Sequence, residues 1–522
     1  MTNLLFRLLP PGLAACLLCA CATLPGPRAI DRTVAAAMQA FSVPGVALGV
    51  VKDGAVVHAR GYGLRQLGRP EPVDGATLFR IASNSKAMTT AALAMLVEQG
   101  RLAWDDKVVD HIPAFALHDE WISREFNVVD LLTHRSGLGR GAGDLMLWPK
   151  PNAFTRDDVI RGLRYFEPAG DFRAGYAYDN TLYIVAGELI PAVTGQSFET
   201  FVDRRLLGAL GLKRCFAGDI PAREMRNLAV PHSLVAGELR VVERNRIRAE
   251  TSMSVAAGGV RCSLDDMLTW IRLQLGRGLS AGGERFWSEA AAEHMWSPQT
   301  IRPFTRYQRE RDRQRDGTHF KAYGLGWRLA DVKGYKEVAH TGTFTGWGSN
   351  VVLIPQLGLG VVVLTNGGMA GPARAAIANS IVRPYLGQRG VDWIAAFTPE
   401  PAAAEARRAL TAVSTEARAA LPLRAYAGYY EDPWFGGVDI YLERDELYFA
   451  SRKSPRLQGP LHAYGKHRFV ARWSDRTLYG DAFVDFLPGA RGMRMRLEPL
   501  PETTDWSFNY RDLDFRRVVE EE

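Results

Sequence analysis

The sequence predicts an α+β protein, in which an antiparallel sheet with helices lies beside an all-helical part, followed by a small antiparallel β-barrel. Apolar strand patterns stand at both ends of a first region, around residues 43–64 and 324–364, and helix-forming patterns fill the interval. This order implies a sheet assembled from distant segments beside a helical part. After Pro422 short alternating strands divided by turns predict the barrel.

The composition indicates a globular protein with more than one domain. A chain of 522 residues exceeds what one hydrophobic core normally supports. Its 47% hydrophobic and 23% charged residues exclude a disordered or fibrous chain. The formal net charge of +7 is spread along the chain, so we expect no nucleic-acid partner, and a nearby anionic lipid or cell-wall polymer is compatible with it.

The first 20 residues have the pattern of a secretory signal peptide. The apolar run Leu8–Ala20 is too short to span a membrane and contains Pro10-Pro11-Gly12. Leu18-Cys19-Ala20-Cys21 resembles the bacterial lipoprotein signal, in which the cysteine is lipidated and becomes the new N-terminus. We therefore expect Cys21 to anchor the protein to a membrane, with residues 23–27 as a tether.

Two alternatives to lipidation at Cys21 remain. Leu13-Ala14-Ala15-Cys16 fits the same pattern but leaves a shorter apolar stretch, and the protein could also be secreted to the periplasm without lipid. By resemblance to such lipoproteins, Ala22 after the cysteine favours the outer membrane. The expected location is the bacterial cell envelope, facing the periplasm.

Cleavage before Cys21 leaves only Cys215 and Cys262 for folding. An exported chain can pair them, but two buried thiols fit the sequence equally well. The histidines show no His-x-x-x-His, and the chain after the expected cleavage site holds no Cys-x-x-Cys, so we expect no metal and no cofactor.

The first region begins with a hairpin and a helix. Lys52-Asp53-Gly54 separates two apolar runs between Val43 and Leu64, which is a strong hairpin signal. Residues 91–99 are strong helix formers, and Gly100 supplies a stop. This places Ser83 and Lys86 on one face of the first turn of a helix.

Further elements follow in order. Helices are expected at residues 128–132 and 182–193, and strands at residues 324–328, 337–341, 349–354 and 360–364. Residues 300–317 carry six arginines interleaved with acidic residues, which is typical of a solvated loop, with partner or membrane contact as the alternative.

The chain then divides at an alanine-rich connector. Residues 391–421 are expected to be helical, with Pro399 and Pro401 as interruptions, between a domain of residues 21–390 and a barrel of residues 422–522. The expected barrel strands are residues 426–430, 438–442, 446–449, 468–473 and 493–497. Their aromatic residues are interpreted as barrel core, with a ligand cavity as the alternative.

Ser83 and Lys86 form a candidate nucleophile and its activator. The free amide hydrogens and the positive dipole end of the helix can stabilise an anion at Ser83. An amine in an apolar setting has a lowered pKa and can take the hydroxyl proton. A lone Ser-x-x-Lys also occurs by chance, so the remaining groups of an acyl-transfer site are needed.

Candidates for those groups occur downstream, and together they resemble a known family. Ser83-x-x-Lys86, Tyr178-x-Asn180 and His340-Thr341-Gly342 are similar to the ordered motifs Ser-x-x-Lys, Tyr-x-Asn and Lys-Thr-Gly of the serine β-lactamase and penicillin-binding protein superfamily. The tyrosine resembles the class C β-lactamase-related branch, and the histidine its esterase and peptidase members. Three further segments look like recurring ones of that branch, at residues 133–138, 256–260 and 323–327.

The tail carries a second resemblance. Tyr426-x-Gly428-x-Tyr430 and Asp432-Pro433-Trp434 resemble the lipocalin-like C-terminal domain found on some of these hydrolases. The two likenesses together imply a β-lactamase-like serine hydrolase domain followed by a lipocalin-like barrel.

The resemblance implies roles for the matching residues. Ser83 is acylated, while Lys86 and Tyr178 share the proton transfers. Asn180 holds a substrate amide or carbonyl, and His340-Thr341-Gly342 with Thr343 lines the substrate site. The backbone amides of Ser83 and Thr343 form the oxyanion hole. A phenol also needs a nearby cation to act as a base near neutral pH, and in the sequence Lys86 is available.

One departure from the family pattern affects the substrate. His340 is mostly neutral at pH 7, so it offers less charge than lysine to a carboxylate. We therefore expect an esterase on small acyl substrates. The alternatives are a D-stereospecific peptidase or weak β-lactamase, and a cell-wall sensor or binding lipoprotein whose acyl-enzyme persists. The oligomeric state and the role of the barrel stay open.

Overall fold

The computed structural model of the protein describes residues 25–235, 237–242, 253–304, 317–399, 417–478, 480–490, 492–500, 504–505 and 507–518. The expected signal peptide, Cys21, most of the arginine-rich segment and most of the connector lie outside these residues. Within the described ranges, no helix combines the length and apolar character needed to cross a membrane.

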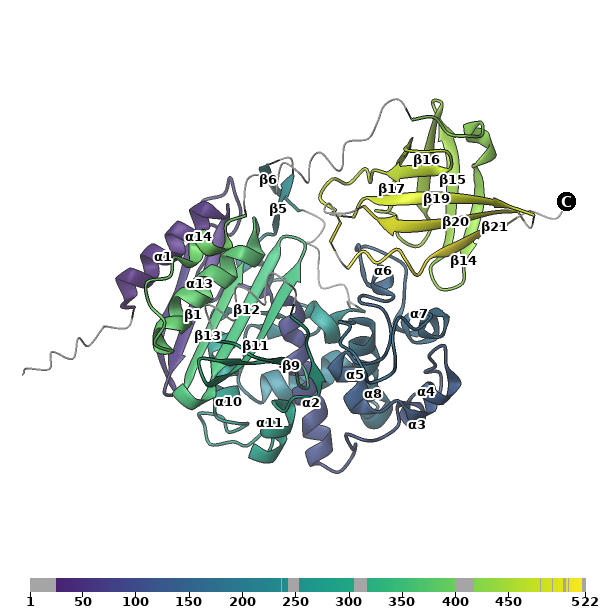
Figure 1. Ribbon diagram of the computed structural model, residues 1–522. Coiled ribbons are helices and arrows are strands. Elements are labelled where there is room, and N and C mark those ends of the chain that lie inside the picture. Colours follow the sequence, from purple (N-terminus) through teal and green to yellow (C-terminus); the bar gives the residue numbers. More distant parts are fainter. Residues whose placement is uncertain are drawn as a thin grey trace, which may run out of the picture.

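An eight-stranded antiparallel sheet organises the first part of the chain (Figure 1). Its order is β2-β1-β13-β12-β11-β10-β9-β8, so strands from the two ends of the region meet in its middle, as predicted. The strands are β1 (Gly45–Lys52), β2 (Ala55–Gly63), β8 (Thr300–Ile301), β9 (Lys321–Tyr323), β10 (Arg328–Val332), β11 (Tyr335–Phe344), β12 (Trp347–Ile354) and β13 (Leu359–Thr365).

The hairpin predicted at Asp53-Gly54 joins β1 to β2. Asp53 has φ 51° and Gly54 has φ 78°, the two left-handed residues of a type I′ turn, whose twist matches that of the strands.

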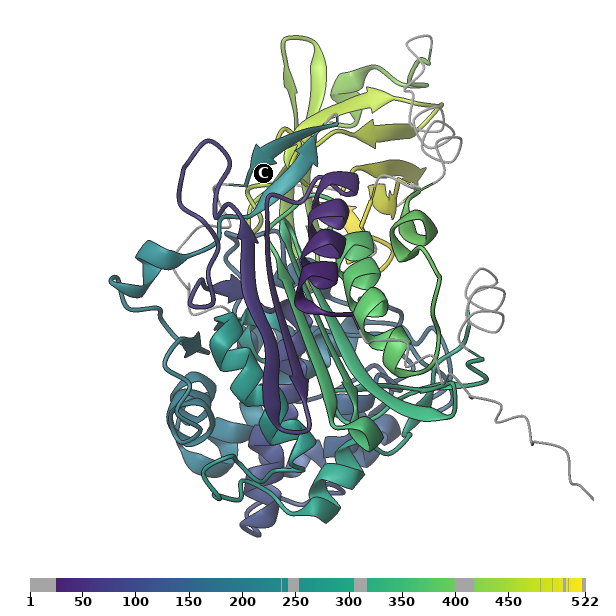
Figure 2. The same cartoon turned by 90° about the vertical axis from the view of Figure 1, so that its left-hand side faces the viewer.

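Helices cover both faces of this sheet. Figure 2 shows α1 (Pro27–Ala40) and α13 (Ala370–Tyr385) side by side on one face, next to α14 (Trp393–Phe397). On the other face α10 (Leu264–Leu275) packs against β1 and β13. Because both faces are covered, β1, β12 and β13 are buried almost throughout instead of alternating.

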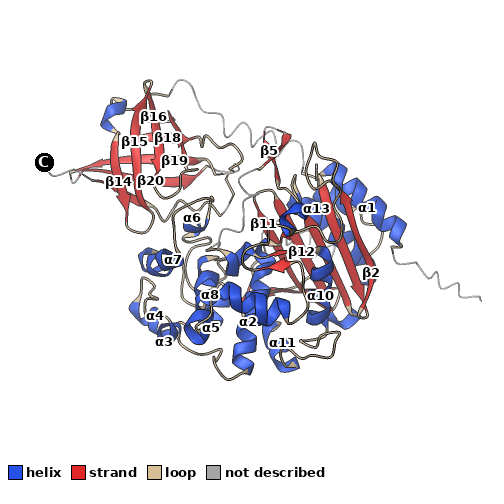
Figure 3. Cartoon of the chain, turned by 180° about the vertical axis from the view of Figure 1, so that it is seen from behind, coloured by secondary structure: helices blue, strands red, loops and turns tan. Residues whose placement is uncertain are grey.

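A helical part stands beside the sheet (Figure 3). It contains α2 (Ser85–Glu98), α3 (Val108–His111), α4 (Glu120–Glu125), α5 (Val128–Thr133), α6 (Asp144–Leu147), α7 (Arg156–Gly162), α8 (Thr181–Thr194) and α9 (Phe198–Phe201), with α11 (Glu289–Met295) near α2. The helices predicted at residues 128–132 and 182–193 are α5 and α8. The helix α2 is buried on nearly all sides, as expected of a helix that is apolar all round.

One predicted strand is wrong. Residues 324–327 form the turn between β9 and β10. Their apolar residues Leu325 and Trp327 are buried because this turn packs onto α2. Gly326 has φ 77°, and a Cβ there would lie 2.9 Å from the carbonyl oxygen of Lys86.

The C-terminal part is a closed eight-stranded barrel. Its strands are β14 (Gly428–Asp432), β15 (Gly436–Glu443), β16 (Glu446–Ser451), β17 (Gln458–Ala463), β18 (Arg468–Ala471), β19 (Ala482–Gly489), β20 (Gly492–Pro499) and β21 (Asp514–Arg517). The five predicted strands correspond to β14, β15, β16, β18 and β20. Aromatic rings such as Tyr426, Phe469 and Phe486 pack together inside, as expected for barrel core.

The barrel packs against the helical part near α6 and α7 (Figure 1). The rings of Phe166 and Trp434 lie 4.9 Å apart between centroids. The Lys453 amine lies 3.1 Å from an Asp158 carboxylate oxygen. The two parts thus share both apolar and charged contacts.

Candidate active site

Ser83 lies in a 3₁₀ turn, Ala82–Asn84, that leads directly into α2. Ala82 has φ 46°, in the left-handed region that residues other than glycine rarely adopt, and strain of this kind is common next to reacting groups. The Ser85 hydroxyl fixes the turn by donating to the Ala82 carbonyl oxygen at 2.7 Å.

A small three-stranded sheet supports this turn. Its order is β3 (Phe79–Arg80), β7 (Arg261–Cys262) and β4 (Cys215–Phe216). Cys215 and Cys262 are cross-strand partners and form a disulfide, so the alternative of two free thiols does not hold. The N–H of Ile81 donates to the Val260 carbonyl oxygen at 3.0 Å, which ties the turn to the segment that leads into β7.

Lys86 is completely buried, and its Nζ lies 3.5 Å from the Oγ of Ser83. The amine donates to Asn180 Oδ1 at 2.6 Å and to the Ala257 carbonyl oxygen at 2.8 Å. Burial lowers the pKa of Lys86 to about 7, although the charge of Asp144 opposes this shift. An amine with this pKa is divided between its two protonation states near neutral pH.

Tyr178 completes the group around Ser83. Its ring centroid lies 4.9 Å from Lys86 Nζ, and its hydroxyl has a hydrogen bond with Ser83 among its interactions. Burial raises the pKa of Tyr178 to about 12, and the charge of Arg328 is the largest opposing influence. The phenol is therefore protonated at neutral pH, and Lys86 is the group poised to accept a proton.

The Asn180 side chain bridges two buried charged groups. Its Oδ1 accepts from Lys86, while its Nδ2 donates to both carboxylate oxygens of Asp144 at 2.9 and 3.2 Å. Burial raises the pKa of Asp144 well above its ordinary value. The sequence did not point to Asp144, because nothing local relates it to Asn180.

The segment of residues 133–138 supports the Tyr178 loop. The Asp179 N–H donates to His134 Nδ1 at 3.1 Å, and the rings of His134 and Tyr178 lie 4.2 Å apart. Burial lowers the pKa of His134 well below its ordinary value, so the imidazole is neutral.

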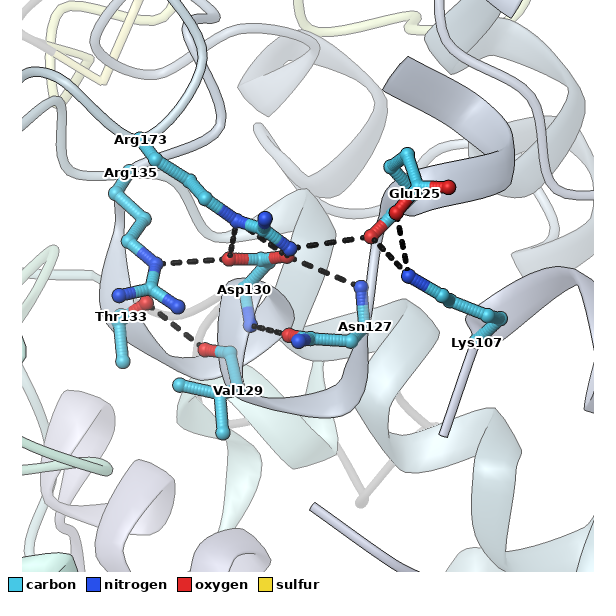
Figure 4. Close-up of polar contacts among 8 residues, drawn as sticks. All are labelled: Lys107, Glu125, Asn127, Val129, Asp130, Thr133, Arg135 and Arg173. Atoms are coloured by element: carbon cyan, nitrogen blue, oxygen red, sulfur yellow. Dashed lines mark hydrogen bonds and ion pairs between the residues drawn. The ribbon is translucent and has the colours of Figure 1, made fainter. Parts of the chain in front are cut away.

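Asp130 holds this segment and the loop together (Figure 4). Its buried carboxylate accepts from Arg135 Nε at 2.8 Å and from an Arg173 guanidinium nitrogen at 2.6 Å. It also accepts from the N–H of Asn127 at 3.1 Å, as part of the capping box of α5. One carboxylate thus links the start of α5 to Arg135, which directly follows His134, and to Arg173, which shortly precedes Tyr178.

The third predicted motif lies on β11, and its His340 and Thr341 side chains form hydrogen bonds with protein groups. His340 is completely buried, donates from Nδ1 to the Thr341 carbonyl oxygen at 2.8 Å and accepts at Nε2 from the Tyr323 hydroxyl at 2.9 Å. Burial lowers its pKa well below the ordinary value, so this histidine is neutral.

Gly342 allows β11 to approach the nucleophile turn. A Cβ at this residue would lie 2.2 Å from the Ile81 carbonyl oxygen and 2.3 Å from Ser349 Oγ. The lack of a side chain at Gly342 thus makes room for the nucleophile turn itself.

Arg328 supplies a cation that the sequence analysis did not identify. Its guanidinium donates to Thr341 Oγ1 at 2.7 Å, and its Cζ lies 5.9 Å from the Tyr178 ring centroid. Arg328 directly follows residues 324–327. The resemblance of residues 323–327 to a recurring segment of the family was thus the signal in the sequence that lay next to it. The cation that most favours ionisation of Tyr178 is thus Arg328, where we had expected Lys86.

Ser83 opens into a pocket of about 420 Å³. Ser83, Asn180 and Thr343 line one end. Much of the remaining wall is apolar, from Trp148, Pro149, Phe344, Trp347, Met369 and Pro372. The barrel closes the pocket with Arg456, Leu478, Asp505, Ser507 and Phe508. Trp148 fixes this closure by donating from Nε1 to the Ser507 carbonyl oxygen at 3.2 Å.

The fold and this site define a serine hydrolase: a hydroxyl at a strained turn, a buried amine of near-neutral pKa, a phenol and an adjoining pocket. The family model described as Beta-lactamase matches residues 30–382, and the chain belongs to this family. A model described as a domain of unknown function, DUF3471, matches residues 413–517.

Curated relatives include hydrolases and a penicillin-binding protein. The chain is 26% identical over 448 residues to the unguisins hydrolase ungD of Aspergillus violaceofuscus, covering 79% of this chain and 76% of that protein. It is 28% identical over 374 residues to penicillin-binding protein 4 of Amycolatopsis lactamdurans, covering 68% of this chain and 89% of that protein.

Solved structures share the fold. The octameric penicillin-binding protein homologue from Pyrococcus abyssi matches with a TM-score of 0.59 and 20% identity, over 93% of this chain and 98% of that chain. A class C β-lactamase from Rhodobacter sphaeroides matches with a TM-score of 0.54 and 21% identity, over 68% of this chain and 99% of that chain.

Proposed function

We propose that the protein hydrolyses small esters through an acyl-enzyme on Ser83. The observation that carries the proposal is the buried Lys86 amine, 3.5 Å from the Ser83 hydroxyl and with a pKa of about 7. A general base works best when its pKa is near the working pH, and this amine meets that condition without another base.

The reaction divides into two halves. Neutral Lys86 takes the hydroxyl proton as Ser83 Oγ bonds to the substrate carbonyl carbon, and the oxyanion is stabilised by the N–H groups of Ser83 and Thr343. When the tetrahedral intermediate collapses, the leaving alcohol takes a proton from Tyr178, which Lys86 replenishes. Water then attacks the acyl-enzyme and loses its proton to the same pair, so that the acid is released and Ser83 is restored.

The pocket supports an apolar substrate. The pocket that Ser83 lines also includes Trp148, Phe344 and, from the barrel, Phe508. Burying apolar groups against such rings contributes about 25 cal/mol per Å² of area removed from water. His340 is neutral and committed to Tyr323, so it offers no charge to the carboxylate of a β-lactam.

A D-stereospecific peptidase is the second candidate, and Arg328 favours it. Its guanidinium donates to the Thr341 hydroxyl and lies near the Tyr178 ring, and a cation there would favour a substrate with a terminal carboxylate. A sensor with a persistent acyl-enzyme receives no such support, because Lys86 and Tyr178 are both placed for proton transfer.

We also propose that Cys21 carries a lipid that anchors the enzyme in the bacterial envelope, facing the periplasm. The proposal rests on the Leu18–Cys21 motif in the sequence. Metabolic labelling with a fatty acid should mark the full chain and not its Cys21→Ser variant; equal labelling of both would place the lipid elsewhere, with Cys16 as the next candidate.

The enzymatic proposal is tested on residues 22–522 with a short-chain p-nitrophenyl ester, a chromogenic cephalosporin and D-amino-acid peptides. Ester turnover that disappears in Ser83→Ala is the expected result. Turnover of peptides alone would favour the peptidase. Labelling of Ser83 by a fluorophosphonate without any turnover would favour the sensor, and activity that survives in Ser83→Ala would exclude Ser83 as nucleophile.

A further inference from the structure

Arg374 of α13 lies buried behind the strand that carries Thr343. Its side chain donates through Nη1 to the Gly342 carbonyl oxygen and through Nη2 to Thr343 Oγ1, the latter at 2.8 Å. Only 8% of the residue is exposed. Both bonds end on two consecutive residues of β11.

No carboxylate within the described ranges forms an ion pair with this guanidinium, so its charge is compensated by β11 itself. Burying an unpaired cation is costly. Burial, followed by the charge of Arg328, lowers the pKa of Arg374 to about 9, which still leaves the group cationic at neutral pH. A costly buried charge that points at one backbone carbonyl requires an explanation beyond packing.

The bonded carbonyl belongs to the same planar peptide group as the N–H of Thr343. A charge-assisted hydrogen bond to the carbonyl oxygen withdraws electron density from that group and strengthens its N–H as a donor. It also opposes rotation of the peptide plane, which the contact of Gly342 with Ile81 and Ser349 already restricts.

We infer that Arg374 is a positioning residue, which orients and polarises the Gly342–Thr343 peptide so that its N–H stabilises the oxyanion formed at Ser83. The inference rests on the proposed function, because it assumes acyl transfer at Ser83. An N–H strengthened in advance acts on the transition state more than on the bound substrate, and such donors lower the barrier without reorganisation.

The test compares Arg374→Met and Arg374→Lys in residues 22–522, with a p-nitrophenyl ester as substrate and phenylboronic acid as the probe. The boronate adds to a serine and places an oxygen where the oxyanion forms.

Loss of an entire oxyanion donor costs about 100-fold to 1000-fold in kcat, so loss of its polarisation in Arg374→Met should cost roughly tenfold, with KM little changed. The Ki of phenylboronic acid should rise by a similar factor, while inhibition by the product acid stays constant. Arg374→Lys should recover part of both effects.

Two controls separate this role from a structural one. Arg383→Met removes another buried arginine of α13, whose partner is Glu337, and should lower the Tm without changing kcat. Thr343→Val removes only the second hydrogen bond of Arg374 and should have less effect than Arg374→Met.

The inference is overturned if Arg374→Met keeps the kcat and boronate Ki of the parent, or if it weakens the boronate and the product acid equally. If Arg374→Met does not fold, the Arg374→Lys variant becomes the test. A phenylboronic acid Ki for Arg374→Lys equal to that of the parent would overturn the inference. Fluorophosphonate labelling of the parent at Ser83 keeps the two proposals apart. A parent that does not label removes the proposed function and this inference together, whereas a labelled parent with unaffected Arg374 variants removes only the inference.

Discussion

The Oδ1 of Asn180 lies 2.6 Å from the Nζ of Lys86. The other end of the same amide donates to Asp144, so a single neutral side chain connects the buried amine to a buried carboxyl group. The assignment expected from sequence was that Asn180 holds a substrate amide or carbonyl. The structure adds a second role, because the hydrogen bonds at both ends of this amide orient Lys86.

This link predicts how the rate depends on pH. Lys86 has a pKa of about 7 and accepts a proton only when neutral, so kcat/KM should rise as the pH increases through about 7. The charge of Asp144 raises the pKa of Lys86. The Asp144→Asn variant should therefore move the rising limb to lower pH. Stopped assays between pH 5 and 9 measure the shift.

Asp157→Asn is the matched control, since Asp157 forms an exposed ion pair with Arg161. This variant should leave the rising limb of the kcat/KM profile at the same pH as in the parent. A limb that moves to higher pH in Asp144→Asn would show that the carboxyl group does not act on Lys86 through its charge.

The Asp130 cluster predicts a stability effect that reaches the site. Asn at residue 130 would keep the size of the side chain but leave Arg135 and Arg173 without their buried partner. The carboxylate is fully buried but the arginine side chains are 17% and 38% exposed, so the loss should lie between about 1 kcal/mol, for an exposed pair, and about 3 kcal/mol, for a buried one. Urea unfolding should show this loss for Asp130→Asn. Asp157→Asn again serves as control, because an exposed pair is worth at most about 1 kcal/mol. Equal stability of the two variants would contradict the prediction.

The disulfide predicts a second stability effect. Cys215 and Cys262 are 47 residues apart in sequence, and closing a loop of this length is worth about 4 kcal/mol in the chain-entropy estimate. The double variant Cys215→Ser/Cys262→Ser should lower the free energy of unfolding by about 2–4 kcal/mol. Because this sheet carries the nucleophile turn, fluorophosphonate labelling of Ser83 should also slow. Unchanged unfolding in urea would mean that the bridge adds nothing to stability.

The sequence predicted the local elements that have strong signals. Asp53-Gly54 marked the β1–β2 hairpin, and the helix formers before Gly100 marked α2. It failed at residues 324–327, where burial comes from packing of a turn on α2. It also missed three barrel strands, β17, β19 and β21. In β17, Gly459 and Pro460 weaken the strand pattern.

The residues of the candidate site also fall into two groups, those that a sequence motif marks and those that no local pattern marks. The three motifs identified Ser83, Lys86 and Tyr178 as residues to bring together, and the structure places their side chains around one point. Asp144, Arg328 and Arg374 have no pattern of their own. They come to the site because segments far apart in the sequence pack together. A single sequence shows no local hydrophobic or spacing pattern that would predict such packing.

The barrel predicts substrate selection through Phe508. This ring lines the same pocket as Ser83 and comes from the barrel. Phe508→Ala should remove apolar contact from the distant part of a long acyl chain but not from an acetyl group. We expect the KM for a p-nitrophenyl octanoate to rise roughly tenfold, since losing part of a buried aromatic contact costs about 1.5 kcal/mol, while the KM for the acetate stays within about twofold.

Two measurements separate selection from damage to the fold. The Leu487→Ala variant removes a barrel side chain that is 40% exposed, and it should change neither KM. Phe508 is only 6% exposed and packs against Tyr510, so Phe508→Ala should also lower the Tm, and an unchanged kcat for the acetate shows that the active site stays folded. Equal rises in KM for octanoate and acetate would mean that the barrel closes the pocket without selecting the acyl chain, and the preference for apolar esters would then have to come from Trp148 and Phe344.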